Sequence, residues 1–83
     1  MGEVRVLYFA TARAAAGTSE ELISFAGLSW DQDSFWMAVI QRHPTLSAQR
    51  GSIRLARNCE YLESGGTIHS GDDIALIPPV SGG

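Results

Sequence analysis

Apolar residues recur along the chain with two different periods, and the change between them predicts where strands and helices lie. Residues 3–9 alternate between polar and apolar and then become fully apolar. In a strand, Tyr8 falls on one face, whereas Leu7 and Phe9 fall on the other. Because both faces end apolar, the run predicts a central strand that is buried on both sides at its end. A second alternating run at 20–25 predicts the hairpin partner of this strand.

The strongest helix signal begins at Ser29. Ser29 and Gln32 fit the S-x-x-Q capping box, which predicts Ser29 as the N-cap. Pro44 disfavours a helical conformation of the residue before it, so this helix is predicted to end at His43. A shorter helical turn is predicted over 12–16. The long helix carries one apolar stripe, made of Phe35, Trp36, Val39, Ile40 and His43.

Short apolar runs in the second half of the chain predict further strands. They lie at 53–55, 61–62 and 73–77, with a brief one at 67–68 and a turn at Asn58. The order strand, strand, helix, strand, strand, strand predicts an α+β fold, with a mixed sheet of about five strands and one main helix across one face. In a chain of 83 residues, this order is what a β-grasp, ubiquitin-like roll requires.

A distinctive segment, Pro-Pro-Val-Ser-Gly-Gly at 78–83, follows the last predicted strand. We therefore predict a domain at 1–77 and a flexible tail at 78–83. The two prolines hold the backbone extended, and six extended residues reach at most roughly 20 Å. Gly82 and Gly83 carry no side chains, so a narrow tunnel on another protein can admit them.

A glycine carboxylate at the end of such a tail suggests a particular chemistry. A carboxylate cannot accept sulfur until it is activated, and an acyl-adenylate is the usual biological route. The tail therefore predicts a sulfur carrier whose Gly83 is adenylated, converted to a thiocarboxylate and delivered into the active site of a partner. Two alternatives stay open: a protein modifier that joins Gly83 to lysines of other proteins, and an interaction domain whose tail is incidental.

Composition narrows the range of partners. The net charge of −3 and the lack of a basic run argue against nucleic acid as a partner. No apolar run approaches the ~20 residues of a membrane-spanning helix, and no apolar signal segment precedes the first strand. A single cysteine, Cys59, cannot form an intramolecular disulfide, which fits a cytoplasmic protein. We expect a cytoplasmic chain that binds neither nucleic acid nor membrane.

Other reactive side chains do not form a recognisable site in the sequence. His43 and His69 have no cysteine or second histidine at ligand spacing, so no metal site is predicted. Cys59 is interpreted as a tolerated small residue rather than a sulfur relay. All six basic residues are arginines. This bias reflects either the codon usage of a genome or the benefit of having no nucleophilic amine beside an activated acyl group.

Several segments resemble one known family, the small subunit of molybdopterin synthase, which is a ubiquitin-like sulfur-carrier family. Residues 71–83 resemble its C-terminal signature, and 6–10, 42–46 and 57–61 resemble its opening and middle, so the similarity spans nearly the whole chain. The sulfur carrier of the thiamine pathway also ends in Gly-Gly on this fold. It is shorter and lacks the Pro-Pro-Val-Ser lead-in, which makes it the less similar alternative.

The resemblance implies a subunit that is not catalytic alone and that serves two partners. A ubiquitin-activating-enzyme-like adenylyltransferase would use ATP to adenylate Gly83, and sulfur would then replace AMP to give the thiocarboxylate. The large synthase subunit would supply the catalytic side chains and convert cyclic pyranopterin monophosphate to molybdopterin, in a heterotetramer of two small and two large subunits. No cofactor would be bound permanently. The segment inserted into the large subunit would be Pro78, Pro79, Val80, Ser81 and Gly82.

The resemblance also implies an apolar docking surface at Phe9, Tyr61 and Ile77. The chain departs from the family pattern at Cys59, where a polar residue is expected, and at Leu76-Ile77, which replaces a more aromatic pair. The second change keeps the surface apolar but would alter its affinity for a given partner.

Overall fold

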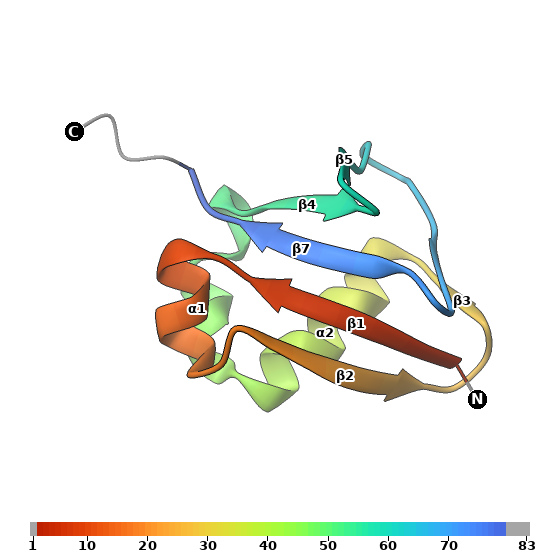
Figure 1. The fold of residues 1–83 in the computed structure, drawn as a ribbon, viewed down its shortest axis with the longest axis horizontal. Coiled ribbons are helices and arrows are strands. Elements are labelled where there is room, and N and C mark those ends of the chain that lie inside the picture. The colour runs from red at the N-terminus through yellow and green to blue at the C-terminus, as the bar shows by residue number, and fades with distance from the viewer. Residues whose placement is uncertain (1, 80–83) are drawn as a thin grey trace.

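In a computed structural model, which describes residues 2–79, the chain forms a five-stranded mixed sheet with two α-helices (Figure 1). The strand order is β2-β1-β7-β4-β5, in which β1 and β7 run parallel and the other neighbours antiparallel. A separate two-stranded sheet pairs β3 with β6. The elements are β1 (Gly2–Tyr8), α1 (Ala10–Ala16), β2 (Glu20–Phe25), β3 (Ser29–Trp30), α2 (Gln32–Arg42), the 3-10 helices η1 (Pro44–Ala48) and η2 (Arg50–Ser52), β4 (Arg54–Arg57), β5 (Glu60–Tyr61), β6 (Ile68–His69) and β7 (Asp73–Ile77).

The core lies between the sheet and α2, which crosses behind the sheet in Figure 1. Alternate residues of β1 point toward the helix and are buried, as the period-two pattern of this strand predicts. Ile74 and Leu76 of β7 join them in the core. From α2, Phe35, Trp36 and Val39 close the core. The predicted mixed sheet with one main helix across one face is therefore confirmed.

The other face of the sheet differs from what the sequence predicts. Leu7 is only half-buried and Phe9 is 49% exposed, so the prediction that the first strand is buried on both sides at its end is wrong. The physical reason is that α2 covers one face alone, whereas α1 follows β1 at the end of the sheet (Figure 1). Within residues 2–79 this second face, which we call the open face, carries no covering element.

The start of the main helix also differs from the prediction. Ser29 belongs to β3, and Asp31 is the N-cap, where its Oδ1 accepts a hydrogen bond of 2.7 Å from the Ser34 amide. Trp30 stacks on Phe25, with ring centroids 4.4 Å apart, which holds this segment in strand pairing with β6. The helix therefore begins two residues later, at an aspartate that caps as well as serine does.

The predicted end of the helix and the predicted turn are confirmed. His43 is the C-cap of α2 and Pro44 begins η1. Between β4 and β5, Asn58 and Cys59 both adopt positive φ, 51° and 74°, which is the backbone of a two-residue hairpin turn. Asn58 also exchanges hydrogen bonds with Asp73, since its amide donates to the Asp73 carbonyl and its Oδ1 accepts from the Asp73 amide. The turn is thereby fixed to the start of β7.

The chain leaves the sheet at the end of β7. Pro78 is buried and Pro79 is exposed. The residues predicted to complete the tail, Val80, Ser81, Gly82 and Gly83, lie outside the described residues, so the predicted division at 77/78 stays a prediction. Within residues 2–79, no helix is long and apolar enough to span a membrane.

Candidate functional site

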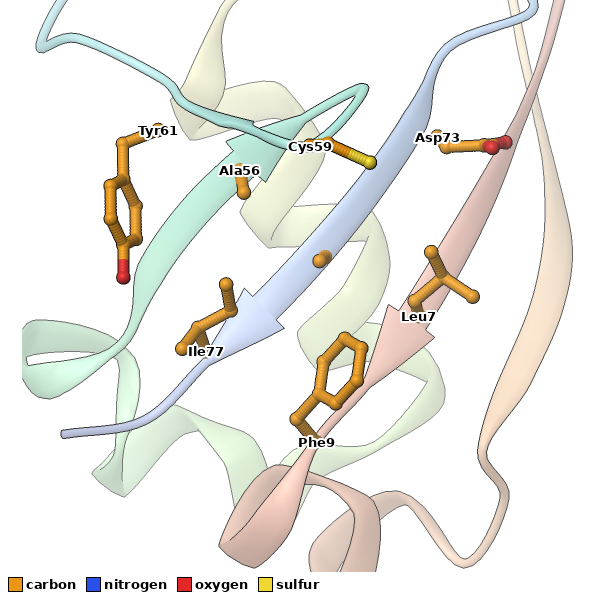
Figure 2. A pocket seen from close by; sticks show the side chains of 8 residues that line it. Leu7, Phe9, Ala56, Cys59, Tyr61, Asp73 and Ile77 are labelled. Carbon is orange, nitrogen blue, oxygen red and sulfur yellow. The ribbon is translucent and has the colours of Figure 1, made fainter. Parts of the chain in front are cut away.

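A shallow apolar groove of about 330 Å³ lies on the open face of the sheet and extends along β7 from Asp73 to Ile77 (Figure 2). Side chains from four strands and the β4–β5 turn line it, and α2 lies behind the sheet in this view. The lining residues are Leu7, Phe9, Ala56, Cys59, Tyr61, Asp73, Ala75 and Ile77.

Strand register explains why the face is hollow here. The pairings Leu7 with Ala75, Ala75 with Ala56, and Ala56 with Tyr61 place these four residues in one row across the sheet. Residues directly opposite one another project from the same face. Two small alanines therefore stand in the middle of the row, between a leucine and a tyrosine. The groove is the space that the missing side-chain volume leaves.

The three residues predicted to form a docking surface come together at this groove. Phe9 and Tyr61 are 49% and 55% exposed, and Ile77 is half-buried between them. The structure thus places Phe9, Tyr61 and Ile77 on one face, although Tyr61 and Ile77 come from β5 and β7 and Phe9 follows β1 as the N-cap of α1. Because each side chain is already about half-buried, a protein that covers it gains about half of the roughly 1.5–3 kcal/mol that complete burial of a large apolar side chain contributes.

Other lining residues were not anticipated from the sequence. Ala56 and Ala75 belong to the groove only through strand register, which no local pattern reveals, whereas Leu7 lies on the face of Phe9 as the alternation predicts. Cys59 is exposed at one edge, where its thiol points over the sheet (Figure 2). The one signal that could have found Ala75 is its spacing of two residues from Ile77, which places both on the same face of a strand.

Charged groups lie at both ends of the groove, and they make different contacts at the two ends. At the end away from Phe9, Arg5 lies 3.7 Å from a Glu20 carboxylate oxygen and 3.9 Å from one of Asp73. At the other end, the guanidinium carbon of Arg54 lies 3.9 Å from the centroid of the Tyr61 ring. Arg54 is the register partner of Ile77, so this cation stands beside the last residue of β7.

The tail begins beside the groove. Ile77 lines the groove, and Pro78 follows it into a small cleft of about 380 Å³ formed with α1 and the 3-10 segment. The other residues of this cleft are Thr11, Ala48, Gln49, Ser52, Ile53 and Pro79. A hydrogen bond of 3.0 Å from the Thr11 hydroxyl to Gln49 joins its two walls. The chain therefore leaves the sheet from a packed position next to the apolar groove.

The histidines do not contribute to this site. His43 lies on the helix face, where its Nε2 is 2.7 Å from Glu21 Oε1 and its ring packs edge-on against Tyr8. The Tyr8 hydroxyl donates to the same Glu21 oxygen at 2.6 Å. Within residues 2–79, no group of three or more His, Cys, Asp or Glu side chains is arranged to hold a metal ion.

Burial and hydrogen bonding shift two pKa values in this cluster. Burial, reinforced by the hydrogen bond to Glu21, raises the pKa of Tyr8 far above its usual range. Burial alone would raise the pKa of Glu21, but hydrogen bonds from Tyr8 and His43, together with the charges of His43 and Arg42, lower it below its ordinary value. Glu21 is therefore a carboxylate at neutral pH and joins β1, β2 and the end of α2.

Comparison with known proteins places this geometry in a family. The sequence model of the ThiS family matches residues 6–83 of this chain. The chain belongs to the ThiS family. It is 38% identical to the human molybdopterin synthase sulfur carrier subunit, over 98% of this chain and 94% of the relative. The same-named subunit of Chlamydomonas reinhardtii is 32% identical over 98% and 99% of the two chains. The resemblance to the small subunit of molybdopterin synthase is thus confirmed.

Solved structures of ThiS-like proteins share the fold. Small archaeal modifier protein 1 of Haloferax volcanii superimposes with a TM-score of 0.83 at 29% identity, covering 99% of this chain and 100% of that one. A putative molybdopterin converting factor subunit 1 of Pyrococcus furiosus gives 0.82 at 24% identity, covering 96% and 100%. A complex of subunits 1 and 2 of the molybdopterin-converting factor of Helicobacter pylori gives 0.65 at 24%, covering 98% and 99%. The predicted β-grasp, ubiquitin-like fold is confirmed.

Proposed function

We propose that this chain is the sulfur-carrier subunit of a cytoplasmic molybdopterin synthase, and that Gly83 carries the sulfur. The observation that carries the proposal is the apolar groove on the open face, because the chain leaves β7 beside it toward Gly82-Gly83. A partner that covers the groove is held next to the root of the segment that presents the reactive carboxyl group. The names of the human and algal relatives support the same conclusion.

In the first step, an adenylating partner binds the groove and receives the C-terminal segment. The Gly83 carboxylate attacks the α-phosphate of ATP, which releases pyrophosphate and leaves an acyl-adenylate. Sulfide then attacks the acyl carbon, and AMP leaves, which gives a thiocarboxylate. ATP belongs to the partner, and this chain binds no permanent cofactor.

In the second step, the large subunit takes the place of the adenylating partner. The segment Pro78, Pro79, Val80, Ser81 and Gly82 enters the large subunit and brings the thiocarboxylate to cyclic pyranopterin monophosphate. The thiocarboxylate sulfur displaces an oxygen substituent of the pterin side chain to give a thioester, and hydrolysis of the thioester leaves the sulfur on the pterin and returns the Gly83 carboxylate. Two such cycles supply the two sulfurs of the dithiolene, in an assembly of two small and two large subunits.

The groove itself is suited to binding rather than to proton transfer. Its lining is apolar apart from Cys59 and Asp73, and Asp73 already lies beside Arg5. Apolar surface removed from water supplies affinity without directional chemistry. The chain therefore docks on the large subunit and presents the Gly83 thiocarboxylate, while the large subunit supplies the reacting side chains.

Reconstituted sulfur transfer tests this function. The thiocarboxylated chain is mixed with the large subunit and cyclic pyranopterin monophosphate, and molybdopterin is measured. The intact chain supports formation, whereas a chain lacking Gly83 supports none and unfolds at the same denaturant midpoint. Full activity of the shortened chain, or loss of its folded state, contradicts the proposal.

A second function is favoured by one comparison. Small archaeal modifier protein 1 shares 29% identity with this chain over nearly its full length. A modifier would join Gly83 to lysine amines of other proteins through the same adenylate. Lysine-linked adducts of this chain in its own cells, absent when Gly83 is deleted, would establish that role.

A further inference from the structure

Arg54 occupies a distinctive position at the edge of the groove. It is exposed, it pairs in register with Ile77, and its guanidinium carbon lies 3.9 Å from the centroid of Tyr61. Since Arg54 and Ala56 alternate with buried Leu55 along β4, the Arg54 side chain stands on the open face. It therefore stands beside two of the three residues that a docked partner would cover.

The stacked position leaves the hydrogen-bonding capacity of Arg54 available. A guanidinium that lies over an aromatic ring uses its π face, whereas its five N–H donors lie in the plane and point away from the ring. Such a planar fork matches a carboxylate in bidentate geometry. Stacking also restricts the side chain before binding, so that less rotamer freedom is lost when a partner arrives.

Arg54 differs from Arg5, a second cation beside the groove, in its distance from carboxylates. Arg5, on the same face, lies within 4.0 Å of two carboxylates. Among residues 2–79, no carboxylate lies within that distance of Arg54. A partner that covers the apolar end of the open face thus meets one cation that the described part of the chain leaves without an anion. Covering it without a counter-charge would remove water from a cation and weaken the complex.

We propose that Arg54 selects the large subunit by donating hydrogen bonds to one of its carboxylates, an aspartate or glutamate, at the rim of the groove. The inference rests on the proposed function, since it names a contact within the docking surface. Phe9, Tyr61 and Ile77 supply most of the burial, and the Arg54–carboxylate pair fixes the orientation of the partner beside the point where the chain leaves β7. A partner with an apolar centre but a cation at this rim would be rejected.

The test measures the affinity of the purified chain for the large subunit of the same organism by calorimetry at several salt concentrations. Arg54→Gln removes the charge and keeps a polar side chain, and we expect it to weaken binding roughly tenfold or more. Gln41→Glu on the exposed side of α2 changes the net charge by the same amount and should bind as the unmodified chain does. Arg54→Lys, which keeps the charge without the planar fork, should fall between them.

Salt dependence distinguishes a charge contact from lost packing. The affinity of the unmodified chain should fall as salt rises, and that of Arg54→Gln should fall less steeply. Binding of Arg54→Gln within twofold of the unmodified chain overturns the inference, and so does a weaker affinity with an unchanged salt slope. An effect confined to the adenylating partner also overturns it. If the unmodified chain does not bind the large subunit at all, the proposed function itself fails.

Discussion

The Phe9 side chain is large and apolar, yet about half of it is exposed to solvent. It is 49% exposed, and it borders the groove where β1 ends. Phe9→Ala should weaken binding to the large subunit by roughly tenfold, because about half of a phenyl ring remains to be buried. Leu22→Ala is the matched control, since Leu22 is 54% exposed on the same face but lies on β2 outside the groove. Equal losses from both substitutions would contradict a docking role for Phe9.

Cys59 tests whether a second sulfur participates. Its thiol is exposed at the groove edge, and its backbone φ of 74° is set by the turn rather than by any chemistry. Cys59→Ser keeps the size and the turn, so sulfur transfer to the pterin should proceed at the unmodified rate. The measurement is single-turnover molybdopterin formation from the thiocarboxylated chain. With the large subunit at saturation, so that docking is complete, a large loss of rate would mean that sulfur passes through Cys59 as well as Gly83.

Among the secondary-structure elements, α2 allows a test of its N-cap by two substitutions at its start. Asp31→Ala removes the side chain that accepts from the Ser34 amide, so it should lower the midpoint of denaturant unfolding. Ser29→Ala should leave the midpoint unchanged, because Ser29 lies in β3 and caps nothing. Urea unfolding followed by tryptophan fluorescence compares the two. If Ser29→Ala lowered the midpoint and Asp31→Ala did not, Ser29 would be the N-cap, as the capping box in the sequence predicts.

The contact of β2 with the end of α2 makes stability depend on pH. Since hydrogen bonds and nearby cations lower the pKa of Glu21, this carboxylate stabilises the fold above its ordinary pKa of 4.5. The stabilisation is lost as the pH falls through the lower, folded-state pKa. Glu21→Gln should cost about 1 kcal/mol of unfolding free energy at neutral pH. It should also flatten the decline of unfolding free energy between about pH 5 and pH 3. An unchanged pH profile would show that Glu21 is not the responsible group.

In the molecule as a whole, sequence patterns that span a few residues predict the fold, whereas the shape of the groove depends on strand pairings between distant segments. Period-two runs and Pro44 act within a few residues, so the strands and the helix end follow from them. Ser29 was misassigned because β6, which pairs with β3, lies far along the chain. The hollow formed by Ala56 and Ala75 likewise depends on β7 lying between β1 and β4. The tail was predicted from its own prolines and glycines, and the three docking residues from the family resemblance, but neither predicts the strand register beside them.

The net charge of the whole chain adds a contrast to its docking surface. Nine acids against six arginines give a net charge of −3, yet the cation at the groove rim is Arg54. Long-range attraction therefore does not favour an acidic partner, and selection of a carboxylate depends on contact at the rim. The absence of lysine leaves the chain with no side-chain amine that its own activated Gly83 could acylate.

The most direct test of the central claim is the intact mass of the chain after coexpression with its adenylating partner. If Gly83 carries sulfur, the mass rises by about 16 Da, the difference between sulfur and oxygen. The gain should disappear when Gly83 is deleted and persist in Cys59→Ser. An unchanged mass in the presence of an active partner, or a gain that requires Cys59, would contradict the account.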